Sequence, residues 1–178
     1  MRSHALALLV AVVVAAPVSA QGFMAEMHRD VREVQQKLVD LAKVMPESSL
    51  DWRPSAGVRS VREALLHIAA DNYLIPIMMG APAPAESKIT SDWATAMTYE
   101  KQQLNRDQIA AALDASFTHL HKAMSLTTDA NLAEQLDFFG QKASRQRVMV
   151  GTVTHLHEHL GQMIAYARSN NVKPPWSR

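Results

Sequence analysis

Cysteine is absent from this chain, although histidine occurs eight times. A protein without cysteine forms no disulfides and has no thiol that could act as a nucleophile or as a metal ligand. Its stability must then come from packing, and any metal site must use histidine, aspartate or glutamate as ligands.

The chain also lacks an excess of charge of either sign. It has 18 basic and 17 acidic residues, without blocks of like charge. Proteins that bind nucleic acids or anionic membranes usually carry a basic surface, so we expect neither as a partner. The expected partner is a small-molecule substrate whose identity the sequence does not give, and a homodimer is left open.

Long apolar runs are missing too, except for one near the N-terminus. A charged start precedes the apolar run from Ala5 to Ala16, and Val18–Ala20 is a small-residue cleavage signal. This pattern predicts a signal peptide over residues 1–20, because a membrane span needs about 20 apolar residues. An uncleaved anchor is the alternative. We expect residues 21–178 to form one exported domain, periplasmic or secreted, without stable membrane insertion.

Four segments of this mature chain have the apolar spacing of amphipathic helices, with apolar residues three and four positions apart. They run from about Phe23 to Met45, from Val61 to Met78, from Asn105 or Asp107 to Leu126, and from Ser144 to Asn170. Ser60 and Glu63 form a capping box before the second helix. The pattern predicts an all-α four-helix bundle with a long crossover between helices 2 and 3.

The connections have little periodicity. The crossover from Gly80 to about Arg106 includes a stretch near residues 91–100 that could form a short helix. The segment from Thr127 to Ala143 is predicted to be a loop, with Phe138–Gly140 as its apolar hinge.

Three histidines lie within five residues of the last predicted helix, in the sequence THLHEHLGQ. Each residue of an α-helix turns the chain by about 100°, so His155 and His159 share one face and His157 points elsewhere. Two histidines four residues apart can bind a divalent metal, as in HExxH proteins, although the general-base glutamate of that motif is missing here. The pair requires a third ligand from another part of the chain.

Three motifs in this order resemble the DinB-like family. They are LDWRP at Leu50–Pro54, SVREALLHI at Ser60–Ile68 and HLHEHLGQ at His155–Gln162. The likeness spans nearly all of the mature chain. It implies a bundle with up-down-down-up helix order, in which the connection between helices 2 and 3 crosses the bundle. It also implies that a divalent metal is held by His67, His155 and His159.

Three neutral imidazoles leave a metal ion its full charge and an open position for water, whose pKa can fall to about 7. Zinc is the first expectation, with nickel, copper, iron or manganese as alternatives. Asp71, one turn after His67, either orients that ring or lies in solvent. Trp52 and Trp176 either cover the open metal position or plug a bundle end.

These features predict an exported metal-dependent hydrolase or transferase of unknown substrate, without an evident general base. The family resembled includes thiol transferases, but a low-molecular-weight thiol fits an exported protein poorly. One alternative is a non-catalytic metal-binding or stress-related bundle, which would have no pocket beside the metal. A haem-binding bundle ranks last, because CxxCH is missing and two histidines one turn apart cannot ligate both faces of a haem.

Overall fold

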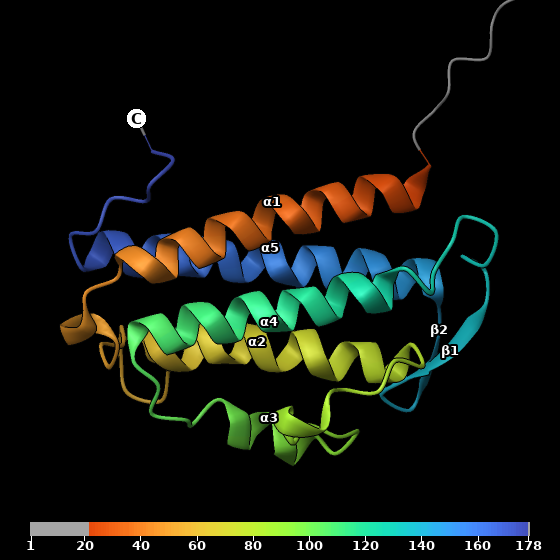
Figure 1. Ribbon diagram of the computed structural model, residues 1–178, viewed down its shortest axis with the longest axis horizontal. Coiled ribbons are helices and arrows are strands. Elements are labelled where there is room, and N and C mark those ends of the chain that lie inside the picture. Colours follow the sequence, from red (N-terminus) through yellow and green to blue (C-terminus); the bar gives the residue numbers. More distant parts are fainter. Residues whose placement is uncertain (1–21, 178) are drawn as a thin grey trace, which may run out of the picture.

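The computed structural model describes residues 22–177 (Figure 1). Within this range the elements are α1 (Phe23–Val44), α2 (Val61–Met78), α3 (Trp93–Tyr99), α4 (Arg106–Met124), β1 (Gln135–Phe138), β2 (Gln141–Ser144) and α5 (Arg145–Ser169), with short 3-10 turns at Glu47–Ser49 and Ala85–Ser87. The expected signal peptide lies outside the described residues.

The four long helices form the predicted bundle. Figure 1 shows α1 and α5 running in one direction and α2 and α4 in the other, which gives the up-down-down-up order. The connection from α2 to α4 returns along the bundle through α3, as expected for the crossover, and α3 is the short helix predicted near residues 91–100. The packing of α2 against α5 brings together the two helices that carry the candidate ligands.

Local capping explains where the helices begin. The Ser60 hydroxyl accepts a hydrogen bond from the backbone N–H of Glu63, whose side chain accepts one from the N–H of Ser60. This is the predicted capping box, and it fixes the start of α2. Ser144 caps α5 by accepting from the N–H of Arg147. Both helices that carry the candidate metal ligands therefore start at positions fixed by their own sequence.

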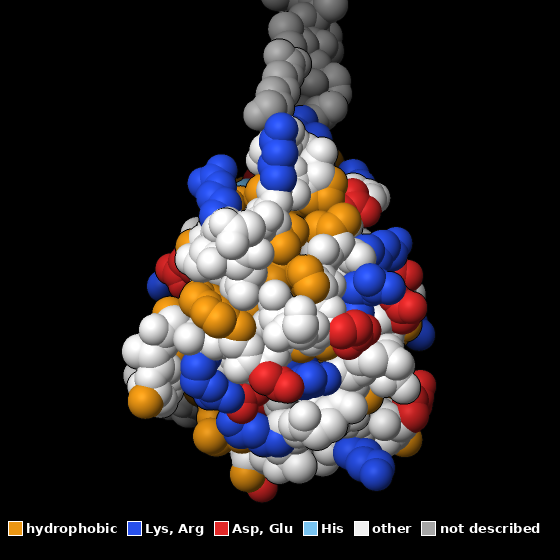
Figure 2. All heavy atoms as spheres, turned by 90° about the vertical axis from the view of Figure 1, so that its left-hand side faces the viewer, with side chains coloured by type: hydrophobic (Ala, Val, Ile, Leu, Met, Phe, Trp, Pro, Cys, Tyr) orange, Lys and Arg blue, Asp and Glu red, His pale blue; other side chains and the backbone are white. Residues whose placement is uncertain are grey.

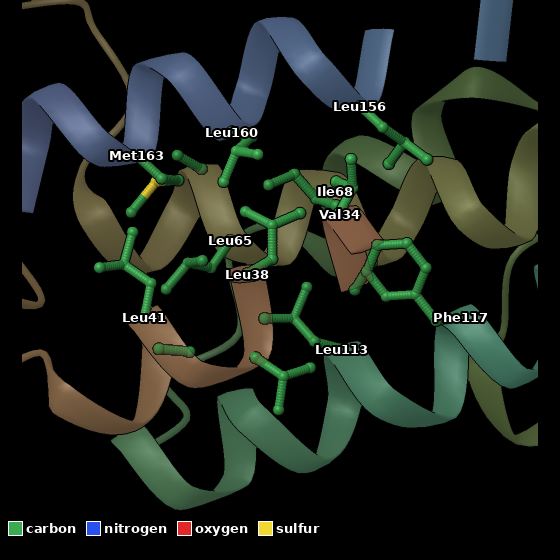
Figure 3. Close-up of a cluster of buried hydrophobic side chains, with 14 of the residues drawn as sticks. Val34, Leu38, Leu41, Leu65, Ile68, Leu113, Phe117, Leu156, Leu160 and Met163 are labelled. Atoms are coloured by element: carbon green, nitrogen blue, oxygen red, sulfur yellow. The ribbon is translucent and has the colours of Figure 1, made fainter. Parts of the chain in front are cut away.

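Figure 3 shows that the core lies between the four long helices, with side chains from each helix pointing toward one another. Leu38 of α1, Leu65 of α2, Phe117 of α4 and Met163 of α5 have no exposed surface. Replacing a fully buried phenylalanine with alanine typically costs about 3–5 kcal/mol. This packed centre gives the site a rigid frame.

One sequence prediction about the fold is wrong in part. The segment from Thr127 to Ala143 was expected to be a loop, but Gln135–Phe138 and Gln141–Ser144 pair as an antiparallel hairpin. Its two-residue turn, Phe139 and Gly140, has φ values of 54° and 77°, the signs of a type I′ turn. The usual Asn-Gly signal of that turn is missing, which is why the hairpin is hard to see in the sequence.

The surface agrees with the balanced composition. On the end of the bundle shown in Figure 2, basic and acidic side chains are interspersed, with hydrophobic side chains between them. None of the helices within residues 22–177 is long and apolar enough to cross a membrane.

Candidate metal centre

Four side chains from α2 and α5 meet at one point beside the core. His67 and Asp71 lie one turn apart on α2, and His155 and His159 lie one turn apart on α5. Each of the four offers one ligand atom, and these atoms all lie within 4.8 Å of one another. His67 and Asp71 are buried, whereas the two α5 histidines are half-buried. The structure thus brings the three predicted histidines together.

The first of these rings, His67, is oriented by a carboxylate from the crossover. Its Nδ1 lies 2.8 Å from Oε1 of Glu100, directly after α3. Arg59 binds the same carboxylate through both oxygens, with Nε 2.7 Å from Oε2 and Nη2 3.0 Å from Oε1. Burial alone would raise the pKa of Glu100, but the hydrogen bonds from His67 and Arg59 lower that pKa to about 2. Glu100 is therefore ionised at neutral pH.

The ionised Glu100 determines which nitrogen of His67 faces the cluster with a lone pair. A carboxylate only accepts hydrogen bonds, so Nδ1 of His67 must donate. In the neutral ring Nε2 then carries a lone pair. This atom lies 3.2 Å from Oδ2 of Asp71, a second acceptor. Two acceptor atoms repel each other at this distance, so either a proton on one of them or a metal cation bound by both is required.

A chain of hydrogen bonds orients His159 in a similar way. The hydroxyl of Tyr166 lies 3.1 Å from the backbone carbonyl of Arg59, to which it must donate because a carbonyl only accepts;. The same oxygen accepts from Nε2 of Gln162 at 3.0 Å. The Gln162 carbonyl oxygen thus faces Nδ1 of His159 at 2.8 Å. That nitrogen must donate, which leaves Nε2 of His159 as the lone-pair nitrogen.

Burial has a further effect on His159. Desolvation lowers the pKa of this ring, and the hydrogen bond to Gln162 and the charge of Asp71 only partly oppose that effect. The neutral ring is favoured, and a neutral imidazole is the form that binds metals.

The Asp71 carboxylate lies between the two helices. Its Oδ2 is 2.7 Å from Nε2 of His155 and also faces His67, whereas its buried Oδ1 has no hydrogen-bond partner within the described part of the chain. A buried charged group without full pairing is costly. The sequence left open whether Asp71 orients His67 or lies in solvent, and the second alternative is wrong.

The donor set fits a divalent cation. Ligand atoms that each lie about 2.1 Å from a tetrahedral ion are about 3.4 Å apart. The atoms of the cluster lie within 4.8 Å of one another, so the widest pair would approach by about 1.4 Å on binding. The lone pairs of His67 and His159 and a ring nitrogen of His155 can bind such an ion, and the adjacent carboxylate of Asp71 adds a negative charge that favours a cation there;. Each of His67 and His159 also has the outer hydrogen-bond acceptor that metal-binding histidines normally have.

A cavity of about 230 Å³ opens directly beside the cluster. Asp71 and His155 form part of its wall, and most of the remainder is apolar, including Trp93 and Phe139. Trp52 instead packs edge-to-face against Tyr166, with ring centroids 5.3 Å apart. Trp52 and Trp176 were the sequence's candidates for covering the open metal position, but neither lines this cavity. Nothing in the sequence indicated the cavity itself.

Glu100 and Arg59 are the functional residues that sequence reasoning missed. Glu100 lies 33 positions from His67, within the crossover. The sequence had no signal for this contact, because it depends on how the crossover returns along α2. The exposed His157 points away from the cluster, as its helical position indicated.

Comparison with known proteins agrees with this architecture. Residues 30–163 match the model of the DinB superfamily. None of the curated proteins matches the chain. Among solved structures, a DinB-like protein from Bacillus cereus is 18% identical, with a TM-score of 0.72, and the alignment covers 89% of this chain and 99% of that one.

Two Bacillus subtilis proteins share the fold. The DinB-like protein YjoA is 15% identical, with a TM-score of 0.62 and coverage of 83% of this chain and 93% of that one. YfiT is 17% identical, with a TM-score of 0.63 and coverage of 89% and 95%, respectively. YfiT has been described as a probable metal-dependent hydrolase with an unusual four-helix bundle topology. At these identities the likeness establishes the fold alone.

Proposed function

This chain belongs to the DinB superfamily, and we propose that it is an exported metal-dependent enzyme, a hydrolase or transferase acting on a small molecule. His67, His155 and His159 would hold one divalent ion. The observation that carries the proposal is the convergence of these rings with Asp71, all four ligand atoms lying within 4.8 Å of one another. The description of YfiT as a probable metal-dependent hydrolase supports the same direction.

A divalent ion at such a site lowers the pKa of bound water or polarises a carbonyl or phosphoryl oxygen. The residues of the chain would supply the remaining functions. Glu100 and Gln162 hold the outer N–H groups of His67 and His159, so that both rings present lone pairs inward. Asp71, which faces both the rings and the cavity, is the group placed to accept a proton at Oδ2.

The cavity beside the cluster favours an enzyme over a protein that only stores metal. A storage site has no need for an adjacent pocket, whereas a reaction requires space for the substrate next to the reacting groups. Here His155 and Asp71 belong both to the cluster and to the cavity wall.

Zinc is the first candidate for the ion, with nickel, iron and manganese as alternatives, because imidazole ligands suit several divalent metals. The sequence of residues 1–20 is typical of a signal peptide;. Because a low-molecular-weight thiol fits an exported protein poorly, the hydrolase is favoured over the thiol transferase. Secretion in a bacterial host tests this part. We expect the mature protein to begin at Gln21 by intact-mass spectrometry, and retention of residues 1–20 would contradict cleavage.

Metal content of the purified protein tests the site. We expect one equivalent of metal per chain by plasma mass spectrometry, and its loss in His155→Ala. His157→Ala is the matched control, because His157 lies on the same helix but is exposed, and it should retain the metal. Equal metal content in the two variants would overturn the assignment.

Turnover is tested separately with a panel of aryl esters, amides and phosphoesters. Activity on at least one class should disappear after treatment with a chelator and return with zinc. Asp71→Asn should lose activity while retaining most of the metal. Full metal loading without activity on any class of substrate would favour the non-catalytic alternative.

A further inference from the structure

The cavity beside the metal cluster is bounded by three aromatic rings from two distant parts of the chain. Trp93 begins α3 in the crossover, whereas Phe138 and Phe139 come from the tip of the hairpin. The rings of Trp93 and Phe139 meet edge-to-face with centroids 6.0 Å apart, and those of Phe138 and Phe139 are 4.7 Å apart. The crossover and the hairpin thus form one aromatic wall.

Two rings of this wall are in positions that do not favour the stability of the fold. Trp93 and Phe139 are each 46% exposed, although burial of large apolar side chains is what stabilises a fold. Phe139 also has a left-handed backbone conformation, with φ of 54°. Asparagine or glycine is usual at this position of a type I′ turn, because other residues are strained there. Strain of this kind at an exposed side chain points to a function for the ring.

One of the α5 residues in the cavity wall is a glycine. Gly151 lies one turn before His155, and a Cβ added there would have Arg147 Nη1 at 3.9 Å as its nearest contact. The backbone of α5 therefore has room for a side chain that the sequence does not supply. The wall of the cavity is mostly apolar, and its two titratable residues, Asp71 and His155, lie side by side, with Oδ2 of Asp71 2.7 Å from Nε2 of His155.

We propose that this cavity binds the aromatic end of the substrate, with the reacting polar group directed toward Asp71 and His155. This inference rests on the proposed function and specifies its substrate class. A cavity of about 150 Å³ accepts benzene, so 230 Å³ accommodates one ring with a short substituent. Trp93 and Phe139 would cover the bound ring. Their exposure is then explained, because they are the side chains that a bound aromatic ring would contact.

A pair of metal-chelating probes tests the proposal on the zinc-loaded protein. Benzohydroxamate carries a phenyl ring, whereas acetohydroxamate has the same chelating group with a methyl. Calorimetry should show at least about 10-fold tighter binding of benzohydroxamate, as expected for burial of one ring. Equal affinities for the two probes would overturn the proposal.

Gly151→Leu adds a side chain to the cavity wall and should abolish this preference, and the zinc content of the same variant verifies that the metal site is intact. Gly161→Leu is the matched control, because Gly161 lies on the same helix with nothing within 4 Å of an added Cβ, and it should retain the preference. A preference unchanged by Gly151→Leu would contradict the proposed location of the ring.

A metal-free experiment separates the cavity from the metal. Benzyl alcohol should shift the indole N–H resonance of Trp93 in the protein without metal, and Gly151→Leu should remove that shift. If acetohydroxamate fails to bind but benzyl alcohol still shifts Trp93, the metal function fails and the aromatic pocket stands. Absence of any shift with benzyl alcohol overturns the pocket.

Phe139→Asn tests the strained ring directly. The variant relieves the turn, so we expect a melting temperature about 2–4 °C higher. It should also bind benzohydroxamate several-fold more weakly, with acetohydroxamate unaffected. Met97→Ala, which removes an equally exposed side chain from α3 outside the cavity wall, should change neither probe. If Phe139→Asn still preferred benzohydroxamate over acetohydroxamate as strongly as the wild type does, Phe139 would not contact the bound ring.

Discussion

Two groups of histidines lie between helices of the bundle, one between α2 and α5 and the other between α1 and α4. In the second group, the rings of His28 and His121 are stacked with centroids 5.8 Å apart and an angle of 17° between them. In the first, the rings of His67, His155 and His159 meet at angles of 79–89°. Stacked rings direct their nitrogens side by side, whereas perpendicular rings can direct theirs at one point.

The charges around the two groups differ as well. Asp71 lies inside the first group, and Glu100 orients one of its rings. The stacked pair has an amide neighbour, with Nε2 of His121 3.0 Å from Oε1 of Gln35. Burial and then Arg32 lower the pKa of His28. The difference shows that neighbouring histidines require carboxylates and convergent nitrogens before they resemble a metal site.

The largest expected effect is the loss of zinc binding on changing a ligand. Free zinc at 100 times its dissociation constant should raise the free energy of unfolding of the wild type by about 2.7 kcal/mol. His67→Ala should show no stabilisation by zinc, and His28→Ala should show the full effect. Chemical denaturation with and without zinc, with circular dichroism to verify folding, measures both. Equal stabilisation of the two variants would remove the distinction between the groups.

A smaller effect is expected from Glu100→Gln. The amide keeps the shape of the side chain but loses the charge that orients His67, and loss of such an outer partner typically costs about 10–100-fold in metal affinity. Competition with a chromophoric chelator measures the change. Asp114→Asn, which alters a carboxylate bonded to Gln35, is the control near the stacked pair. If this control weakened zinc binding as much as Glu100→Gln, the proposed role of Glu100 would fail.

Tyr166→Phe should have a still smaller effect on the same titration. It removes the hydroxyl that orients Gln162 toward His159 but leaves the ring and its packing with Trp52. We expect affinity to fall by less than about 10-fold, the lower end for an outer-sphere change. No measurable change would show that Gln162 keeps its orientation unaided.

The smallest effect concerns the stacked pair and pH. Burial, followed by the charges of His28 and Arg32, lowers the pKa of His121. The folded state therefore favours the neutral ring, and its stabilising contribution is complete above about pH 6.5 and lost as the pH falls through the lowered folded-state pKa. His121→Gln should make unfolding less sensitive to acidification below pH 6.5. Identical pH profiles for variant and wild type would contradict this.

The helices could be predicted because their signals are local. Apolar spacing marked the core faces, and capping residues such as Ser60 and Ser144 marked the starts of α2 and α5. The pair His155 and His159 followed from helical geometry alone. His67 required the family resemblance, since nothing in its own helix distinguishes a ligand from a core histidine.

The remaining features could not be predicted because they depend on contacts between distant segments. Glu100 meets His67 only after the crossover has returned along the bundle. The aromatic wall forms only where Trp93 meets Phe139, and the Phe-Gly turn of the hairpin lacks the usual sequence signal. The stacking of His28 on His121 also joins distant segments, because these residues lie on α1 and α4.

Anomalous diffraction from crystals of the zinc-loaded protein tests the central claim most directly. We expect one strong peak among His67, His155 and His159, with Zn–N distances of about 2.0–2.1 Å. A peak at the stacked pair of His28 and His121, or no peak at the α2–α5 cluster with zinc in excess, would contradict it.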